Sequence, residues 1–258
     1  MRENPVKQRL AEGGHAFGAM TFEFFSPGMP QLVRAAGAEF VIFDMEHSGI
    51  GIETIKAQLA ACRGLGIVAG VRVPATQYHF IARCLDAGAM MIMVPMVEGV
   101  EQARDIVRFC HYPPHGQRGA AFGVAHDDYT PGPVADKLAA ARRRTQVIVQ
   151  IETPRGAAAA DDIAAIDGVD VLWLGHFDMT NFMGIPGQFE HPDYLAAMHG
   201  VVAAARRHGK TAGFMAGDET WARDYLAHGF RIMAYGLDST LYQTALARGL
   251  AAMRGAAT

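Results

Sequence analysis

The chain has 258 residues, half of them hydrophobic, with 26 acidic residues against 23 lysines and arginines. A formal charge of -3 offers no broad basic surface for nucleic acid, and the short run Arg142 to Arg144 is typical of a solvated helix end. No apolar run approaches the roughly 20 residues that span a bilayer, and the first ten residues lack a signal-peptide core. The three cysteines are widely spaced in apolar stretches, as free thiols are. We therefore expect a cytoplasmic protein that binds neither nucleic acid nor membranes.

Short apolar and β-branched runs recur along the chain, with helical patterns between them. The first four are HAFGAMT (15–21), EFVIFDM (39–45), IVAGVRV (67–73) and AMMIMVP (89–95). The next four are QVIVQIE (146–152), DVLWLGH (170–176), KTAGFMA (210–216) and FRIMAYG (230–236). Near-continuous apolar strands that alternate with helices indicate a parallel sheet covered on both faces. We predict one α/β domain over residues 1–258, a TIM (β/α)₈ barrel.

A doubly wound sheet is the alternative architecture. It is less favoured, because eight repeats fill the chain and no G-x-G-x-x-G motif opens the first helix. One long irregular stretch, residues 112–133, interrupts the alternation and is rich in Gly, Pro, His and Asp. Such a stretch is either a functional loop or a plain surface excursion, and the sequence leaves both open.

If the chain forms such a barrel, its catalytic residues should lie at the carboxyl ends of the strands. Polar side chains stand at these positions: Asp44, Glu46, His47, Arg72, Gln150, Glu152, His176 and Asp178. Charged groups that end apolar strands are costly to bury unless they are paired or bind a metal. Several such groups at one rim indicate a site.

Glu152 and Asp178 are carboxylates on neighbouring strand ends. Two carboxylates, completed by substrate oxygens and water, suit an octahedral divalent ion such as Mg²⁺ or Mn²⁺. Alone, either carboxylate could instead cap a helix or form a salt bridge. Together they predict a metal site.

His47 and Arg72 are the candidates for proton transfer and charge stabilisation. The imidazole of His47 suits a general base if a carboxylate orients its other nitrogen, and Asp44 and Asp86 are the candidates for that carboxylate. The guanidinium of Arg72 could stabilise an enolate or a substrate carboxylate, or could merely pair with an acidic side chain. None of the four lysines is placed for Schiff-base chemistry, so covalent catalysis is not expected.

Taken together, the motifs resemble one family over nearly the whole length. They are FDMEH (43–47), VRVP (71–74), LDAGAMMIMVPMV (85–97), YPPHGQRG (112–119), VQIET (149–153), GHFDMT (175–180) and GLDSTL (236–241). The chain resembles the HpcH/HpaI aldolases, class II pyruvate aldolases that include 4-hydroxy-2-oxoheptanedioate aldolase and 2-keto-3-deoxy sugar-acid aldolases. The resemblance implies a carbon–carbon lyase that converts 4-hydroxy-2-oxo acids to pyruvate and an aldehyde, or the reverse.

The resemblance also assigns roles to residues. It implies that Glu152 and Asp178 bind Mg²⁺, Mn²⁺ or Co²⁺, that pyruvate chelates this ion, and that Gln150 and the backbone near Phe177 and Asp178 contact the substrate. It implies further that Arg72 stabilises the enolate and that His47 is the base, made more basic by Asp86, with Asp44 as a secondary partner. Family members assemble as homohexamers, trimers of dimers that exchange C-terminal helices, which residues 241–253 could do.

One departure from the family pattern bears on the substrate. Where relatives commonly read Gly-Pro, a small residue and Asp-Leu, this chain reads Gly175, His176, Phe177, Asp178 and Met179. His176 could donate a proton or could be a packed residue. Two alternative functions stay open: another lyase on the same metal-enolate apparatus, such as a 2-oxo-acid decarboxylase or CoA-thioester lyase, and a non-catalytic ligand-binding barrel.

Overall fold

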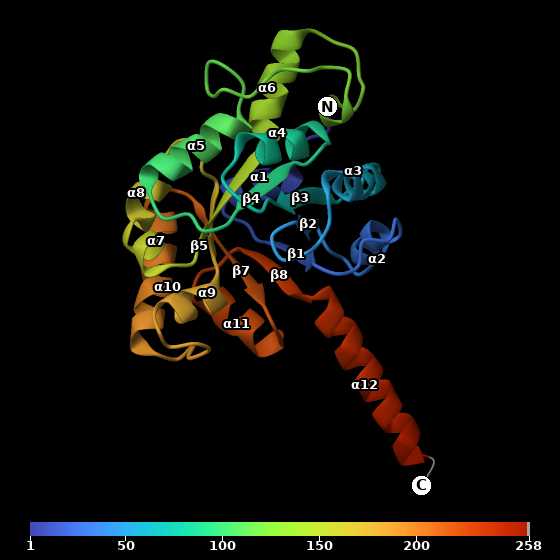
Figure 1. Ribbon diagram of the computed structural model, residues 1–258, viewed down its shortest axis with the longest axis vertical. Coiled ribbons are helices and arrows are strands. Elements are labelled where there is room, and N and C mark those ends of the chain that lie inside the picture. Colours follow the sequence, from blue (N-terminus) through green and yellow to red (C-terminus); the bar gives the residue numbers. More distant parts are fainter. Residues whose placement is uncertain (257–258) are drawn as a thin grey trace.

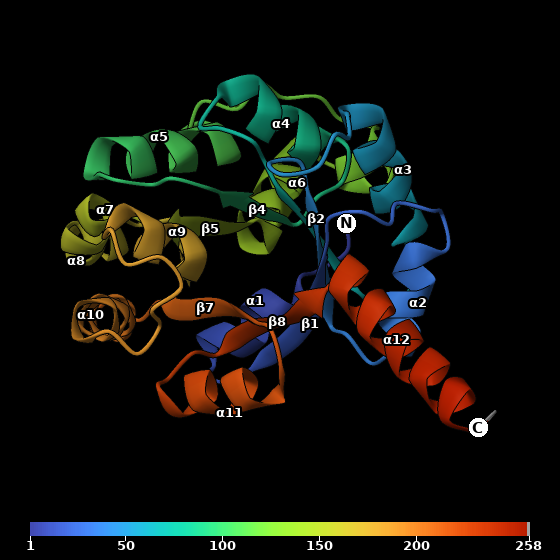
Figure 2. The same ribbon diagram turned by 60° about the horizontal axis from the view of Figure 1, so that its bottom comes forward.

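The computed structural model describes residues 1–256 and contains a closed barrel of eight parallel strands in sequence order (Figures 1 and 2). The strands are β1 (Ala16–Thr21), β2 (Phe40–Asp44), β3 (Val68–Arg72), β4 (Met91–Val94), β5 (Gln146–Ile151), β6 (Val171–Leu174), β7 (Thr211–Ala216) and β8 (Ile232–Leu237). Each lies within or overlaps one predicted run, so the TIM-barrel prediction is confirmed. The predicted domain extends to Thr258, and residues 257–258 lie outside the described residues.

The helices surround this barrel. Those before β5 are α1 (Pro5–Ala11), α2 (Met29–Ala35), α3 (Ile52–Ala61), α4 (Tyr78–Asp86), α5 (Val100–Cys110), the 3₁₀ helix η1 (Ala125–Asp127) and α6 (Val134–Arg144). Those after β5 are α7 (Pro154–Ala158), α8 (Ala160–Ala164), α9 (His176–Phe182), α10 (Pro192–Arg207), α11 (Glu219–Ala227) and α12 (Asp238–Ala256). Within residues 1–256, no helix combines the length and the apolar character needed to cross a membrane.

The barrel interior follows the two-residue period of its strands. Inward-facing side chains form one buried cluster, which includes Phe40, Ile42, Met91, Ile148 and Trp173. The alternate positions pack outward against the helices in a second cluster. Because successive residues point to opposite faces, a strand that is apolar inside the barrel presents its last inward residue at the barrel mouth.

The long segment 112–133 is irregular apart from η1, as predicted, and it is held by buried polar contacts. Lys137 donates to Asp127 Oδ2 at 2.5 Å, and Arg144 donates to the carbonyl oxygen of His126 at 2.7 Å. Arg118, whose side chain is buried, donates to Asp86 Oδ1 at 2.5 Å. These contacts tie the segment to α4 and α6.

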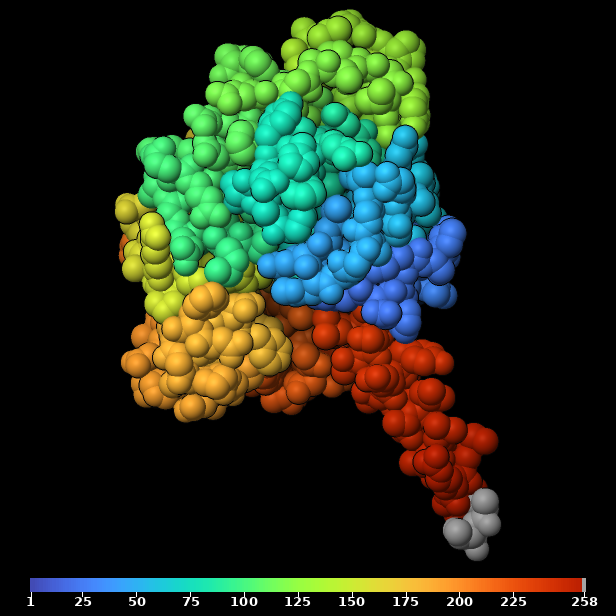
Figure 3. All heavy atoms as spheres, viewed as in Figure 1, coloured from blue at the N-terminus to red at the C-terminus, as the bar shows by residue number. Residues whose placement is uncertain are grey.

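Helix α12 leaves the barrel and projects away from it (Figures 1 and 3). Its first residue, Asp238, is its one buried residue among those described, and several of its apolar side chains are exposed. In a usual (β/α)₈ barrel the last helix packs back between the last strand and the first. Here the outer surface of β8 and β1 lacks that cover from its own helix.

Glycines inside the barrel make room for large neighbours, which gives a test of the packing. A methyl group added to Gly213 would lie 2.4 Å from Trp173 Cε3 and 3.0 Å from Ile232 Cγ2. We expect Gly213→Ala to lower the free energy of unfolding by about 1–3 kcal/mol, measured by urea denaturation. The control is Gly200→Ala on α10, where an added methyl meets nothing within 4 Å. It should leave stability unchanged or raise it by up to about 1 kcal/mol, and equal effects at the two sites would contradict this packing.

Candidate active site

The polar residues predicted at the strand ends line the barrel mouth. Asp44 and Arg72 are the last residues of β2 and β3, and Gln150 and Glu152 continue the inward face of β5 that begins with Ile148. All four are buried, from 0% exposed for Asp44 to 6% for Arg72. The same pleat that places apolar residues in the barrel therefore places these side chains at its carboxyl end.

Asp44 organises the loop that follows β2. Its Oδ1 accepts from Arg72 Nε at 2.5 Å and from the backbone N–H of Glu46 at 3.2 Å. Its Oδ2 accepts from the backbone N–H of His47 at 2.7 Å. A buried carboxylate with a guanidinium and two amide donors is well compensated, so Asp44 fixes both Arg72 and the backbone of residues 46–47.

Arg72 keeps one donor group free. Its Nη1 lies 3.1 Å from Glu46 Oε2, and its Nε is bonded to Asp44. Its buried Nη2 has no hydrogen-bond partner within the described residues. Because buried polar groups are almost always bonded, an unpartnered guanidinium nitrogen at a barrel mouth is a donor available to a ligand.

Phe22 and Asp238 belong to this arrangement, and sequence reasoning missed the part they play in it. The ring of Phe22 lies 5.0 Å from the guanidinium carbon of Arg72 and stacks near the ring of His47. The carboxylate of Asp238 accepts the backbone N–H groups of residues 22, 23 and 24 at 2.8–3.2 Å. In the sequence, Asp238 stands out only as part of the GLDSTL motif (236–241). Its contribution is to hold the loop after β1 against the site.

Glu152 is held firmly at the mouth. Its Oε1 accepts from the N–H of Met96 at 2.6 Å, and its Oε2 accepts from Gln150 Nε2. Met96 has a positive φ of 55°, a conformation that is unfavourable for this residue type and is found at functional sites. Gly175 packs against the carboxylate, where a methyl group would lie 2.3 Å from Glu152 Oε2. A glycine is therefore required beside Glu152.

Three carboxylates repel one another at this mouth. The pKa of Glu152 is raised to about 7, chiefly by burial and also by the charges of Glu46 and Asp178, while the hydrogen bonds from Gln150 and Met96 act to lower it. The pKa of Glu46 is also raised to about 7, chiefly by burial; the charge of Arg72 acts to lower it, and those of Asp44 and Asp178 act to raise it. Such a cluster is stabilised by a cation.

The donor set fits a hard divalent ion. Glu152 and Asp178 would supply oxygen ligands, and Gln150 Oε1 is buried without a hydrogen-bond partner among the described residues. Within residues 1–256, no group of three His, Cys, Asp or Glu side chains has metal-binding spacing. With these two carboxylates as ligands, a magnesium-type ion would complete its octahedral shell with water and substrate oxygens.

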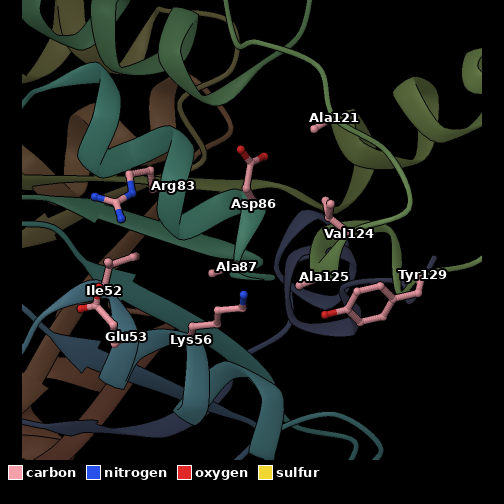
Figure 4. Close-up of a pocket in the computed structure, with 10 residues that line it drawn as sticks. All are labelled: Ile52, Glu53, Lys56, Arg83, Asp86, Ala87, Ala121, Val124, Ala125 and Tyr129. Carbon is pink, nitrogen blue, oxygen red and sulfur yellow. The ribbon is translucent and has the colours of Figure 1, made fainter.

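His47 and Asp86 are not brought together within the chain. His47 lies in the loop after β2, is exposed, and places its Nε2 3.7 Å from Glu46 Oε2. Asp86 is the last residue of α4, at the opposite end of that helix from the barrel mouth, and pairs with Arg118. It lines a cavity of about 470 Å³ between α3, α4 and the 121–129 segment (Figure 4).

His176 and Phe177 take opposite environments at the start of α9. His176 is buried among Phe177, Phe189, Phe214 and Trp221, and this burial lowers its pKa to about 4. The imidazole is therefore neutral near pH 7, and of the two alternatives the packed residue is the one observed. Phe177 is 57% exposed and forms part of the rim.

The buried carboxyl of Glu152 predicts a stability that depends on pH. Its folded pKa is near 7 against an ordinary value of 4.5, so ionisation destabilises the metal-free fold progressively from pH 4.5 and fully above pH 7. We expect Glu152→Gln to be more stable than the native chain in chelator, by roughly 2–3 kcal/mol more at pH 8 than at pH 5. Urea denaturation at the two pH values measures this difference.

The control for that experiment is Glu101→Gln, whose native carboxylate is 82% exposed. This variant should show no widening difference from the native chain between pH 5 and pH 8. The substitution Glu152→Gln need not break the contact with Gln150. If the side-chain amide of Gln150 rotates by half a turn, its Oε1, which has no partner in the native chain, can accept a hydrogen bond from the new amide at position 152. A stability difference for Glu152→Gln that does not change with pH would contradict the raised pKa.

Comparison with known proteins places this barrel in a family. The family model described as HpcH/HpaI aldolase/citrate lyase matches residues 22–245, and the chain belongs to that family. It is 35% identical to a hydroxypyruvate/pyruvate aldolase from Roseovarius nubinhibens, over 94% of both chains. It is 34% identical to a 5-keto-4-deoxy-D-glucarate aldolase from Klebsiella pneumoniae, over 85% of both.

A solved structure has the same fold. The HpcH/HpaI aldolase from Desulfitobacterium hafniense superposes with a TM-score of 0.92 at 29% identity, over 96% of both chains. The relatives are aldolases, so the protein is an enzyme of the carbon–carbon lyase class. The family match confirms the resemblance that the sequence motifs predict.

Proposed function

We propose that the enzyme is a divalent-metal-dependent aldolase that interconverts 4-hydroxy-2-oxo acids with pyruvate and an aldehyde. The observation that carries this proposal is the juxtaposition of mutually repelling carboxylates, Glu46, Glu152 and Asp178, with the unpartnered Nη2 of Arg72. A cation would offset the repulsion among the carboxylates, and the free Nη2 of Arg72 can donate to an anionic oxygen. An oxo acid that becomes an enolate can interact with both the cation and Arg72.

In this proposal Glu152 and Asp178 hold Mg²⁺, Mn²⁺ or Co²⁺, whose Lewis acidity would polarise the 2-oxo group of the substrate. Arg72 donates from Nη2 to the oxygen that gains negative charge, while Asp44 and Glu46 keep the guanidinium in place. The side-chain amide of Gln150 also contacts the substrate. The backbone near Phe177 and Asp178 contacts the substrate carboxylate.

His47 is the general base of the proposed cleavage. It removes the proton of the 4-hydroxyl group, the bond between C3 and C4 breaks, and the aldehyde carbonyl forms. The electron pair of the broken bond remains on C3 as the enolate, which takes up a proton to give pyruvate. Phe177, exposed at the rim, borders the space for the aldehyde.

The role proposed for Asp86 requires a second protomer. Within one chain Asp86 is paired with Arg118 at the far end of α4, so it does not orient His47 there. Its carboxylate is 38% exposed in the cavity of Figure 4 and is open to a residue from outside the chain. We propose that Asp86 acts on His47 of a neighbouring copy.

The activity is tested by pyruvate release from a panel of 4-hydroxy-2-oxo acids, coupled to lactate dehydrogenase, with Mg²⁺, Mn²⁺ or Co²⁺ supplied or chelated. The aldol direction is tested with pyruvate and with hydroxypyruvate, since relatives are named for both. We expect turnover that requires metal. His47→Ala should lower kcat by about 10²-fold or more, because it removes the proton acceptor.

The same assay tests whether turnover depends on the proposed metal ligands. Glu152→Gln should abolish metal-dependent turnover and weaken Mn²⁺ binding measured by calorimetry. His208→Gln, which changes a partly buried histidine paired with Asp161 on the outer surface, should leave turnover intact. Absence of pyruvate release with every metal and substrate would contradict the aldolase proposal, and proton exchange at pyruvate without aldol turnover would favour a different metal-dependent lyase.

We also propose that the chain forms a homohexamer, a trimer of dimers in which α12 docks on a neighbouring copy. A groove of about 510 Å³ runs between α2, β1 and the start of α12, with Phe17, Leu32 and Leu241 in its walls. Tyr242, Leu246, Leu250 and Met253 are exposed at helical spacing along α12. The apolar face of one helix fits the apolar groove of another copy.

Light scattering after gel filtration tests this assembly. We expect the double variant Leu246→Asp with Leu250→Asp to yield a smaller particle than the native chain, because two charges would have to be buried in the groove. Val134→Asp is the control, since Val134 is 52% exposed at the start of α6. A native monomer, or an unchanged particle size in the double variant, would contradict helix exchange.

A further inference from the structure

A second cavity lies at the end of the barrel opposite the catalytic mouth. It has a volume of about 420 Å³ and is formed where α10 and α11 end and where β1, β7 and β8 begin. Of the described residues, five with basic side chains and none with an acidic side chain line it: His15, Arg206, Lys210, His228 and Arg231. Gly13, Gly209 and Gly229 make up part of the remaining wall.

The positive charges of this cavity are not balanced by ion pairs. Arg231 donates to the backbone carbonyl oxygens of Leu10, Gly14 and Lys210, and to Thr211 Oγ1, at 2.9–3.4 Å. Carbonyl oxygens satisfy its hydrogen bonds and leave its charge uncompensated. Lys210 donates to the carbonyl oxygen of Ile166 at 3.2 Å.

Nearby carboxylates are already engaged. Asp170, a carboxylate whose pKa is raised by burial, is paired with Lys7 at 3.0 Å and accepts the backbone N–H of Val147, and the charge of Lys210 acts on it without forming a salt bridge. Within the described part of the chain, no salt bridge joins a carboxylate to Arg206, Lys210 or Arg231. His228 contacts another histidine, His199, at 3.2 Å.

Helix dipoles explain part of this charge. Arg206 lies in the last turn of α10 and His228 caps the end of α11, where cations offset the negative helix end. Lys210 and Arg231 precede strands β7 and β8 instead, and both are half-buried. Their convergence on one cavity therefore has no explanation in helix capping.

We propose that this cavity binds a small anion with two or more negative charges, either a phosphate ester or a polycarboxylate. The size suits a metabolite, and the walls offer guanidinium, ammonium and imidazole donors for charge-assisted hydrogen bonds. Val202, Ala205 and Ala212 give an apolar side against which a carbon skeleton packs. A ligand bound here would contact residues near the start of the chain, such as His15, and residues 202–231, away from the catalytic mouth.

Calorimetric titration of the full-length protein tests the site. The phosphate probe is fructose 1,6-bisphosphate and the polycarboxylate probe is tricarballylate, with sodium chloride at matched ionic strength as the reference. We expect saturable binding of one of them with a dissociation constant of about 1 mM or tighter. Whichever probe binds identifies the ligand class, whereas no saturable binding of either would overturn the proposal.

Variants locate the binding. Arg206→Gln with Lys210→Gln should weaken binding roughly tenfold or more, since two charged donors are lost. Arg206→Gln alone, at an exposed position, gives a smaller loss and serves if the double variant is unstable. The matched control is Arg223→Gln on α11, whose guanidinium contacts Thr220 outside the cavity. Binding that is equal in the double variant and in the control would place the anion elsewhere and overturn the site.

Discussion

The buried ion pair between Asp44 and Arg72 is the interaction on which the arrangement of the barrel mouth depends. Asp44 is fully buried, and it bonds Arg72 and the amides of residues 46 and 47 with its two oxygens. Removing one partner of a buried pair leaves an uncompensated charge, which costs more than the pair contributes. The pair therefore fixes the guanidinium, the Glu46 carboxylate and the backbone of His47 as one unit.

The fold and most of the mouth could be predicted from sequence because one physical rule governs both. Parallel strands covered on both faces are apolar throughout, so a charged residue at a strand end is conspicuous in the sequence. Asp44, Arg72 and Glu152 were found in this way, and the structure places them at one rim. The family resemblance then rested on motifs that include these same residues, and the comparisons confirmed it.

Other features depend on contacts between segments distant in sequence, which no local pattern reports. Asp238 is separated from Phe22 by 216 residues, yet it binds that residue's amide. The choice between a proton donor and a packed residue at His176 was decided by four aromatic neighbours from α9, β7, α11 and the loop before α10. Asp86 is a plausible partner for His47 in the sequence, but α4 carries it away from the mouth.

The carboxylate of Asp238 has a further consequence for how the molecule works. The residue is both the first of the projecting helix α12 and the acceptor for the amides of residues 22–24, whose Phe22 ring covers Arg72. The loop is also in contact with α12 through the edge-on packing of Phe24 against Tyr242. A change in the direction of α12 would therefore move the loop that holds the Phe22 ring beside Arg72, so the position of the projecting helix and the geometry of the barrel mouth are structurally linked.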